Sequence, residues 1–328
     1  MSILVTGGAG YIGSHCVAAL LEGGADVVVI DNLSTGHRKA LRGGKFYPGD
    51  VSDRSFLNMV FSREHIEAVI HFAAFSLVGE SMRTPERYFR NNSAAGLTLL
   101  EAMLAHKVPY LVFSSTAATY GEPKYTPIDE NHPQNPTNPY GESKRIMEGM
   151  LKWCDSAHGL KYAALRYFNV AGACRDGSIG EDHRPETHLI PLVLATALGK
   201  RESLSLYGTD YPTKDGTCIR DYIHVEDLVN AHSLALDYLR GGNPSAAFNL
   251  GNGQGFSNLE IIEAARQVTK APIPVRAEGR RPGDPAVLVA SSKKAMEVLG
   301  WQPKFTRMDD IISSAWKWHT AHPEGYDE

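Results

Sequence analysis

Cysteine is scarce in this sequence, and no two cysteines stand close enough to form a metal-binding or redox pair. Four occur among the 328 residues, none with Cys-x-x-Cys spacing: Cys16, Cys154, Cys174 and Cys218. This pattern argues against a zinc site and against a disulfide framework. We therefore expect no metal and a reducing, cytoplasmic location.

The sequence also lacks a long hydrophobic run and a long run of one charge. No stretch approaches the roughly 20 apolar residues that a membrane-spanning helix needs. An apolar run begins at residue 3, which leaves no room for a signal peptide. Lysine and arginine number 33 against 37 acidic residues, a net charge of -4. Neither nucleic acid nor a membrane is an expected partner, and an anionic ligand would need arginines placed locally.

Short apolar runs alternate with longer amphipathic stretches along the first half of the chain. Runs such as ILVTG, DVVVID, EAVIHFAA, YLVFSS and KYAALRYFNV are typical of parallel strands that are buried on both faces. Helices are expected near residues 11–22, 85–106 and 139–157. The pattern predicts an α/β fold with a doubly wound parallel sheet, Rossmann-like, of at least six strands.

After about Gly172 the alternation loosens into connections rich in glycine, aspartate and proline. This change predicts a dinucleotide-binding domain over residues 1–172 and a smaller, substrate-covering C-terminal lobe over residues 173–328. The strand expected at residues 246–252 could return to the main sheet or belong to the lobe.

A glycine-rich turn separates the first strand from the first helix. Gly7 permits the tight turn, Gly10 lets the backbone approach a pyrophosphate, and Gly13 allows close packing of helix and strand. Asp31 ends the next strand, where a carboxylate would accept hydrogen bonds from ribose hydroxyls and repel a 2′-phosphate. The turn therefore predicts NAD rather than NADP. Asp50 ends the third strand, where adenine would lie; a solvated loop aspartate or a cap for the next helix is the alternative.

Tyr-Gly-Glu-x-Lys occurs twice, at Tyr120 to Lys124 and at Tyr140 to Lys144. Residues four apart share a face only where the chain is helical, and Pro123 disfavours a helix in the first copy. Tyr120 and Lys124 are therefore not expected to project together.

The second copy follows Asn138 and Pro139, which suit the N-cap and the first helical position. Tyr140 and Lys144 should then share a helix face. The lysine ammonium and the helix dipole would favour the phenolate and bring the tyrosine pKa toward neutrality, as a general base for a sugar hydroxyl requires. If this Tyr-x-x-x-Lys match stood alone, an ordinary tyrosine and lysine on an exposed helix face would be the alternative. The strand that ends in Ser114, Ser115 and Thr116 favours the catalytic interpretation, because a hydroxyl there can bind the same substrate oxygen.

Several longer motifs carry a family resemblance. VTGGAGYIGSH, VIDNLSTG, HFAA, SSTAATYGEP, NPYGESK, RYFNVAGA, DGTCIRDYIHVEDL and RRPGDPA resemble the UDP-glucose 4-epimerase family of the extended short-chain dehydrogenase/reductase superfamily. The resemblance covers nearly the whole chain. It implies a homodimeric isomerase of galactose metabolism that keeps NAD bound and makes residues 173–328 a nucleotide-sugar-binding lobe.

The resemblance also implies residue roles. Tyr140 would be the acid/base, Lys144 would hold the nicotinamide ribose, and Thr116, where the family usually has serine, would hydrogen-bond the sugar C4 oxygen. Some relatives have lysine at the position of Ser76. The implied cofactor-binding residues are Gly7, Gly10, Tyr11, Ile12, Gly13, Asp31, Asn32, Thr35, Gly36, Asp50, Val51, Phe72, Ala73, Ala74, Ser76, Asn91, Lys144 and Phe168.

On the substrate side, the resemblance implies arginines at the diphosphate, and arginine forks match phosphate oxygens. It also implies that a bulky aromatic a few residues after the Arg-x-Gly-Asp motif excludes N-acetylated sugars, whereas smaller side chains admit them. Plainer alternatives stay open: an ion pair of Arg220 with Asp221, a core tyrosine at position 207, a capping histidine at position 188 and a turn at Asp284. The implied substrate-binding residues are Thr116, Tyr140, Asn169, His188, Leu189, Tyr207, Arg220, Arg281, Asp284 and Leu288.

The implied reaction interconverts UDP-glucose and UDP-galactose through a transient 4-keto sugar that turns over before the hydride returns. A 4,6-dehydratase typically carries acidic residues directly after the threonine of the fifth strand, where this chain has Ala117 and Ala118. A decarboxylase shares the oxidation step, and an inactive NAD-binding regulator would not need the intact set of Tyr140, Lys144 and Thr116. UDP-N-acetyl sugars are expected as additional substrates because Leu288 stands at the selecting position.

Overall fold

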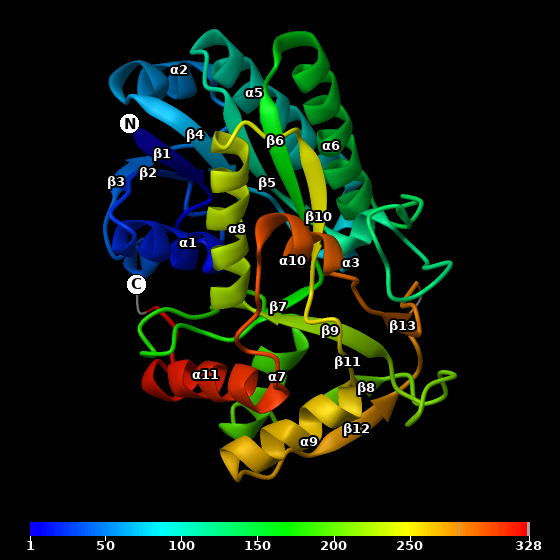
Figure 1. Cartoon of the computed structure of the whole chain (residues 1–328). Helices are drawn as coiled ribbons and strands as arrows, with labels where there is room; N and C mark the ends of the chain where they lie inside the picture. Colours follow the sequence, from blue (N-terminus) through cyan, green and yellow to red (C-terminus); the bar gives the residue numbers. More distant parts are fainter. Residues whose placement is uncertain (282, 327–328) are drawn as a thin grey trace.

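The main sheet of the computed structural model is parallel throughout and has seven strands in the order β10-β6-β5-β4-β1-β2-β3 (Figure 1). The structure describes residues 1–281 and 283–326. The predicted doubly wound α/β class is confirmed, and the seven strands agree with the expectation of at least six. The strands are β1 (Ser2–Thr6), β2 (Asp26–Asp31), β3 (Lys45–Pro48), β4 (Ile66–His71), β5 (Tyr110–Thr116), β6 (Lys161–Tyr167) and β10 (Ala246–Leu250).

Helices cover both faces of this sheet because successive strand residues point to opposite sides. Val5 packs toward α1 (Tyr11–Glu22), α8 (Val225–Arg240) and α10 (Lys293–Leu299). Leu4 packs toward α2 (Arg54–Arg63), α5 (Ala95–Ala105) and α6 (Pro139–His158). Two apolar layers result, and they leave the carboxyl edge of the sheet free to carry polar side chains.

The helix expected over residues 85–106 is interrupted. It consists of α4 (Pro85–Tyr88), the π-helix η2 (Phe89–Ala94) and α5, and it follows the short helix α3 (Val78–Ser81). The Asn92 amide in the π-turn bonds the backbone of Phe75 and the hydroxyl of Ser143. The helical stretch predicted over residues 85–106 is confirmed, and within it these contacts with distant segments favour the wider turn.

The smaller lobe lies beyond the carboxyl edge of the main sheet (Figure 1). Strand β9 is its centre, with β11 antiparallel and β7 and β13 parallel to it, while β8 and β12 form a separate parallel pair. The lobe contains β7 (Asn169–Ala171), α7 (Leu189–Ala197), β8 (Leu204–Tyr207), β9 (Ile219–His224), β11 (Gly255–Ser257), α9 (Asn258–Thr269), β12 (Val275–Glu278), β13 (Val287–Leu288) and α11 (Met308–Ala321).

The chain passes between the lobes more often than a two-part division suggests. The single strand expected at KYAALRYFNV is split at Phe168 into β6 of the main sheet and β7 of the lobe. Of the two places considered for residues 246–252, the main sheet is the one observed for β10, which pairs with β6. Pro282 of the RRPGDPA motif and residues 327–328 of the predicted lobe lie outside the described residues.

No helix in residues 1–281 and 283–326 combines the length and apolar character needed to cross a membrane.

The glycine turn after β1 allows a test of packing. A Cβ at Gly13 would lie 2.1 Å from the Gly7 carbonyl oxygen, whereas a Cβ at Gly10 would meet only that oxygen, at 3.4 Å, and Gly10 has an ordinary φ of -76°. We expect Gly13→Ala to lower the free energy of unfolding by about 1–3 kcal/mol and Gly10→Ala to change it by less than about 0.5 kcal/mol. Urea denaturation of nucleotide-free protein measures both, and equal losses would contradict this packing.

Candidate functional site

Most of the predicted site residues of the first 172 positions gather at the carboxyl edge of the main sheet. The strand order reverses between β1 and β4, which places the loops that follow these strands on either side of a crevice. A Cβ at Gly7 would lie 2.5 Å from the Ala73 amide nitrogen, and one at Gly36 would lie 2.8 Å from the Ala9 carbonyl carbon. The structure therefore packs three predicted cofactor segments against one another.

The first turn of α1 faces this crevice without a capping side chain. Gly10 occupies the N-cap position, no side chain caps the helix, and its first turn has no acidic residue. Unpaired amides and the positive end of the helix dipole attract anions. The Tyr11 hydroxyl is occupied elsewhere, since it donates to the Gly172 carbonyl at 2.6 Å. The turn is chemically suited to a pyrophosphate.

The carboxylate of Asp31 is held rigidly at the end of β2. Its two oxygens accept hydrogen bonds from the backbone amides of Ala9 at 2.9 Å and Leu33 at 2.8 Å. The Asn32 amide donates to Asp50 at 2.7 Å, so the residues expected at ribose and adenine are neighbours. Asp50 also accepts from the Ser52 amide at 2.8 Å, but the cap of the next helix, α2, is Asp53, so the capping alternative for Asp50 is wrong.

Other predicted cofactor residues follow the same edge with varying exposure. Asn91 donates to Asn92, whose amide binds the Phe75 carbonyl, so the π-turn is tied to the loop after β4. The ring of Phe72 packs 4.8 Å from that of His232. Thr35 and Ser76 are exposed, and Val51 is buried.

Tyr140 and Lys144 stand at the start of α6, which begins as the sequence predicts. The Asn138 side chain accepts a hydrogen bond from the Gly141 amide at 2.8 Å and caps the helix. The Tyr140 phenol lies beside the hydroxyl of Thr116 at the end of β5, which is the side chain that influences its titration. The Lys144 ammonium donates to the Ser114 carbonyl at 2.7 Å. Tyrosine, lysine and threonine thus meet at one point of the sheet edge.

The expected lowering of the tyrosine pKa is not what this arrangement produces. Burial raises the pKa of Tyr140, and the hydrogen bond from Thr116 opposes the rise only in part. Burial also lowers the pKa of Lys144 to about 7, so at neutral pH this lysine is only partly charged. The prediction underestimated the cost of removing both groups from water.

The tyrosine and lysine of the first Tyr-Gly-Glu-x-Lys copy lie in different environments, as expected. Tyr120 is buried; its hydroxyl donates to Asn249 at 2.6 Å and accepts from Arg166 at 2.8 Å. Lys124 is exposed. The first Tyr-x-x-x-Lys motif is therefore a structural anchor followed by a loop.

A small apolar cluster adjoins the Thr116 end of β5. Phe168, Ala117 and Tyr120 pack together, and Leu288 of β13 packs against them. Asn169 follows directly and lies opposite Tyr222 in the pairing of β7 with β9. The predicted sugar-selecting and nicotinamide-side residues are thereby brought together, although they are 120 positions apart in the sequence.

The two predicted diphosphate arginines lie in the lobe with different partners. Arg220 donates to the carbonyls of Ile219 and Pro285 and lies 3.5 Å from the Asp284 carboxylate. The alternative pair with Asp221 is wrong, because the Asp221 carboxylate accepts from three backbone amides, those of Asn252, Gly253 and Ala290. The second of the two arginines, Arg281, stacks its guanidinium over the Tyr207 ring, 3.9 Å from the ring centroid.

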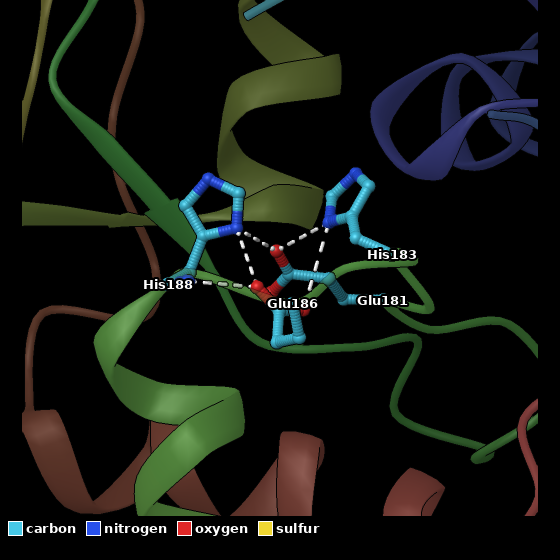
Figure 2. A group of neighbouring side chains, drawn as sticks. All are labelled: Glu181, His183, Glu186 and His188. Carbon is cyan, nitrogen blue, oxygen red and sulfur yellow. Dashed lines mark hydrogen bonds and ion pairs between the residues drawn. The ribbon is translucent and has the colours of Figure 1, made fainter. Parts of the chain in front are cut away.

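His188 occupies the N-cap position of α7, directly before Leu189, without making a side-chain cap. Its ring instead joins Glu181, His183 and Glu186 (Figure 2). Burial lowers the pKa values of both histidines, but the carboxylates outweigh it and raise them to about 9 for His183 and about 10 for His188. The sequence interpretation missed the other three residues, although the Glu-x-His-x-x-Glu-x-His spacing was a visible signal.

Comparisons with known proteins agree with this geometry. Residues 3–251 match the NAD dependent epimerase/dehydratase family. The chain is 60% identical over 327 residues to a UDP-glucose 4-epimerase of Lacticaseibacillus casei, covering 99% of each, and 60% identical over 332 residues to one of Streptococcus mutans, covering 100% of this chain and 99% of the other.

Solved structures are similar over the same extent. A crystal structure of a UDP-glucose 4-epimerase superposes with a TM-score of 0.98 at 57% identity and full coverage of both chains. A UDP-glucose 4-epimerase of Bifidobacterium longum in complex with NAD+ and UDP gives 0.95 at 40% identity, covering 99% of this chain and 100% of that one.

The buried ammonium of Lys144 predicts a pH-dependent stability. Its folded pKa of about 7 lies below the ordinary 10.5, so between these values the unfolded chain binds the extra proton and stability rises with pH. We expect Lys144→Met to stabilise nucleotide-free protein by about 1 kcal/mol at pH 7, with the gain shrinking toward pH 10. Urea titrations at both pH values measure this gain. Lys152→Met, at an exposed position of the same helix, is the control, and a pH-independent gain for Lys144→Met would contradict the assignment.

Proposed function

The chain belongs to the NAD dependent epimerase/dehydratase family, and from this premise we propose that it is an isomerase that interconverts UDP-glucose and UDP-galactose with bound NAD. The observation that carries the proposal is the meeting of Tyr140, Thr116 and Lys144 at the sheet edge. It occurs in a chain that matches such epimerases over its whole length.

The residues after β1 fit NAD. Packing within the chain requires glycine at positions 7 and 13 but leaves space beside Gly10, so the second glycine serves an approaching ligand. The Asp31 carboxylate, fixed by two amides, keeps lone pairs for ribose hydroxyls and would repel a 2′-phosphate. The residues proposed to hold NAD are Gly7, Gly10, Tyr11, Ile12, Gly13, Asp31, Asn32, Thr35, Gly36, Asp50, Val51, Phe72, Ala73, Ala74, Ser76, Asn91, Lys144 and Phe168.

Tyr140 is the proposed acid/base of the reaction. Its oxygen takes the proton of the sugar C4 hydroxyl while Thr116 hydrogen-bonds the same sugar oxygen, and the proton returns when the hydroxyl re-forms. When bound, NAD supplies a reversible acceptor for the C4 hydride, which gives a transient 4-keto sugar. Lys144 positions the cofactor ribose and, when protonated, favours the phenolate.

Inversion at C4 requires the keto sugar to present its opposite face. Arg220 and Arg281, proposed at the diphosphate, would anchor one end of the substrate while the hexose turns about its link to the phosphate. Asp284, already beside Arg220, is proposed at the uridine ribose. The other proposed substrate residues are Asn169, His188, Leu189, Tyr207 and Leu288.

A 4,6-dehydratase is the competing reaction for this fold. It would need an acid and a base beside the hydroxyl residue of β5, where Ala117 and Ala118 form the start of the 3-10 helix η3 (Ala117–Thr119). Methyl groups cannot transfer protons. This feature favours epimerisation.

We also propose a cytoplasmic homodimer with a cofactor domain at residues 1–172 and a nucleotide-sugar lobe at residues 173–328. Trp153 of α6 is 73% exposed and Leu97 of α5 is 44% exposed. Large apolar side chains on neighbouring helices support an interface with a second copy. The segments of α8 and β10 that return to the main sheet would belong to the cofactor domain.

Removing the phenol oxygens of the two tyrosines tests the catalytic assignment. We expect Tyr140→Phe to lower kcat by at least about 100-fold, the contribution of a general acid or base. Tyr120→Phe should keep appreciable turnover but lose about 1–2 kcal/mol of unfolding free energy, because Arg166 and Asn249 lose a buried partner. Steady-state epimerisation and urea denaturation measure the two effects, with Lys124→Ala as an exposed control. Full turnover by Tyr140→Phe would refute the assignment.

The sugar range follows from the side chain proposed to select the C2 substituent. Leu288 is smaller than an aromatic ring and lies against the Phe168 cluster, so UDP-N-acetylgalactosamine should be turned over as well as UDP-galactose. Leu288→Tyr should reduce kcat/KM for the N-acetylated sugar by at least about 10-fold more than for UDP-galactose, as a steric clash worth over 1.4 kcal/mol implies. No detectable turnover of the N-acetylated sugar by the unaltered chain would overturn this expectation.

A further inference from the structure

Four potential metal ligands converge between the two lobes. Glu181, His183, Glu186 and His188 each offer one ligand atom, and these atoms all lie within 4.8 Å of one another. All four come from one short segment that leads into α7. Figure 2 shows both imidazole rings directing a nitrogen toward the two carboxylates.

The distances between the histidine nitrogens and the carboxylate oxygens are close to those of a tetrahedral metal site. The His188 Nδ1 atom lies 2.9 Å from Glu181 Oε1 and 2.9 Å from Glu186 Oε1. The His183 Nδ1 atom lies 3.1 Å from Glu181 Oε1 and 3.7 Å from Glu186 Oε2. A tetrahedral ion with bonds of about 2.0–2.1 Å separates its ligands by about 3.3 Å. The four histidine–carboxylate separations lie within about 0.4 Å of this spacing, and all four ligand atoms lie within 4.8 Å of one another.

Charge balance permits an ion at this position. Two carboxylates carry two negative charges, which are neutralised either by two protonated imidazoles or by one divalent cation with both rings neutral. The Glu181 side chain is only 5% exposed, so an unbalanced charge here would be costly. Replacing two protons with one divalent ion leaves the total charge of the cluster unchanged.

The donor atoms select the kind of ion. Two imidazole nitrogens with two carboxylate oxygens suit zinc, whereas calcium and magnesium prefer oxygen ligands alone. The Glu186 Oε1 atom also accepts from the amides of Thr187 at 2.6 Å and His188 at 2.7 Å, which orients the carboxylate as outer-shell bonds do in metal sites. A cavity of about 470 Å³, lined in part by Glu181, His183 and Glu186, provides access for an ion.

We propose that Glu181, His183, Glu186 and His188 bind one zinc ion that fastens the segment between the lobes. The His183 ring lies edge-on to Tyr11 at the first turn of α1, 6.2 Å between centroids, and His188 directly precedes α7. The ion would thus link the first turn of α1, where the pyrophosphate is proposed to bind, to the first turn of α7 in the smaller lobe. The scarcity of cysteine excludes a thiolate zinc site but not this one. His188 is also a proposed substrate residue, so the test alters His183, which is not among the residues proposed to bind NAD or substrate.

Zinc binding to chelator-treated, tag-free protein tests the proposal. We expect one zinc per chain by elemental analysis after dialysis, and cobalt should give the intense visible absorption of a tetrahedral site. His183→Asn should weaken zinc affinity at least about 100-fold in calorimetric titration. His319→Asn, which alters the same cavity wall outside the cluster, should bind as the unaltered chain does.

Two measurements keep the result independent of folding and of turnover. Far-UV circular dichroism of metal-free His183→Asn checks that it folds, and the cobalt spectrum of the unaltered chain needs no variant. Zinc should also raise the thermal midpoint of the unaltered chain but not that of His183→Asn. Less than about 0.1 zinc per chain at equimolar metal, or unchanged affinity in folded His183→Asn, would overturn the proposal.

Discussion

The buried ion pair between Arg166 of β6 and Glu148 of α6 fixes the geometry on which the site depends. The guanidinium makes two bonds to the carboxylate, of 2.9 and 2.6 Å, and Ser115 of β5 donates to the same carboxylate at 2.5 Å. Two strands and one helix are thereby held in a single register. Breaking a pair of this kind by removing one partner costs about 3–5 kcal/mol. Glu148 lies two helical turns beyond Tyr140, so this register sets where the tyrosine meets Thr116.

The same ion pair gives the tyrosine of the first Tyr-Gly-Glu-x-Lys motif, Tyr120, a structural role. A further N–H group of the Arg166 guanidinium donates to the Tyr120 hydroxyl, which itself donates to Asn249 on β10. The tyrosine of the first motif therefore completes the hydrogen bonding of the buried network, and its phenol is fully committed to protein partners. The tyrosine of the second motif has Thr116 as its partner at the open edge of the sheet. The same Tyr-Gly-Glu-x-Lys pattern thus supports the fold in the first copy and supplies the proposed acid/base in the second.

Local patterns predicted the parts of this molecule that depend on local rules. The glycine turn, the cap at Asn138 and the apolar strands follow from neighbouring residues, and all were confirmed. The π-turn could not be predicted, because the contacts of Asn92 reach segments distant in sequence. The pKa of Tyr140 was misjudged for a related reason, since the burial that raises it depends on the folded surroundings of the phenol and not on neighbouring residues in the sequence. Two of the partners of Arg220, Asp284 and Pro285, likewise lie far along the chain, just before β13.

Chain crossings also join the two lobes beside the sheet edge. The crossing at Phe168 is tied to the end of β10, where its amide donates to the Leu250 carbonyl at 3.1 Å, and the chain crosses again where β9 meets α8. The first crossing adjoins the Thr116 end of β5, because Phe168 packs with Ala117. The lobes are thus joined next to the residues proposed for the proton transfer, and a substitution at Phe168 would alter the join and the proposed site together.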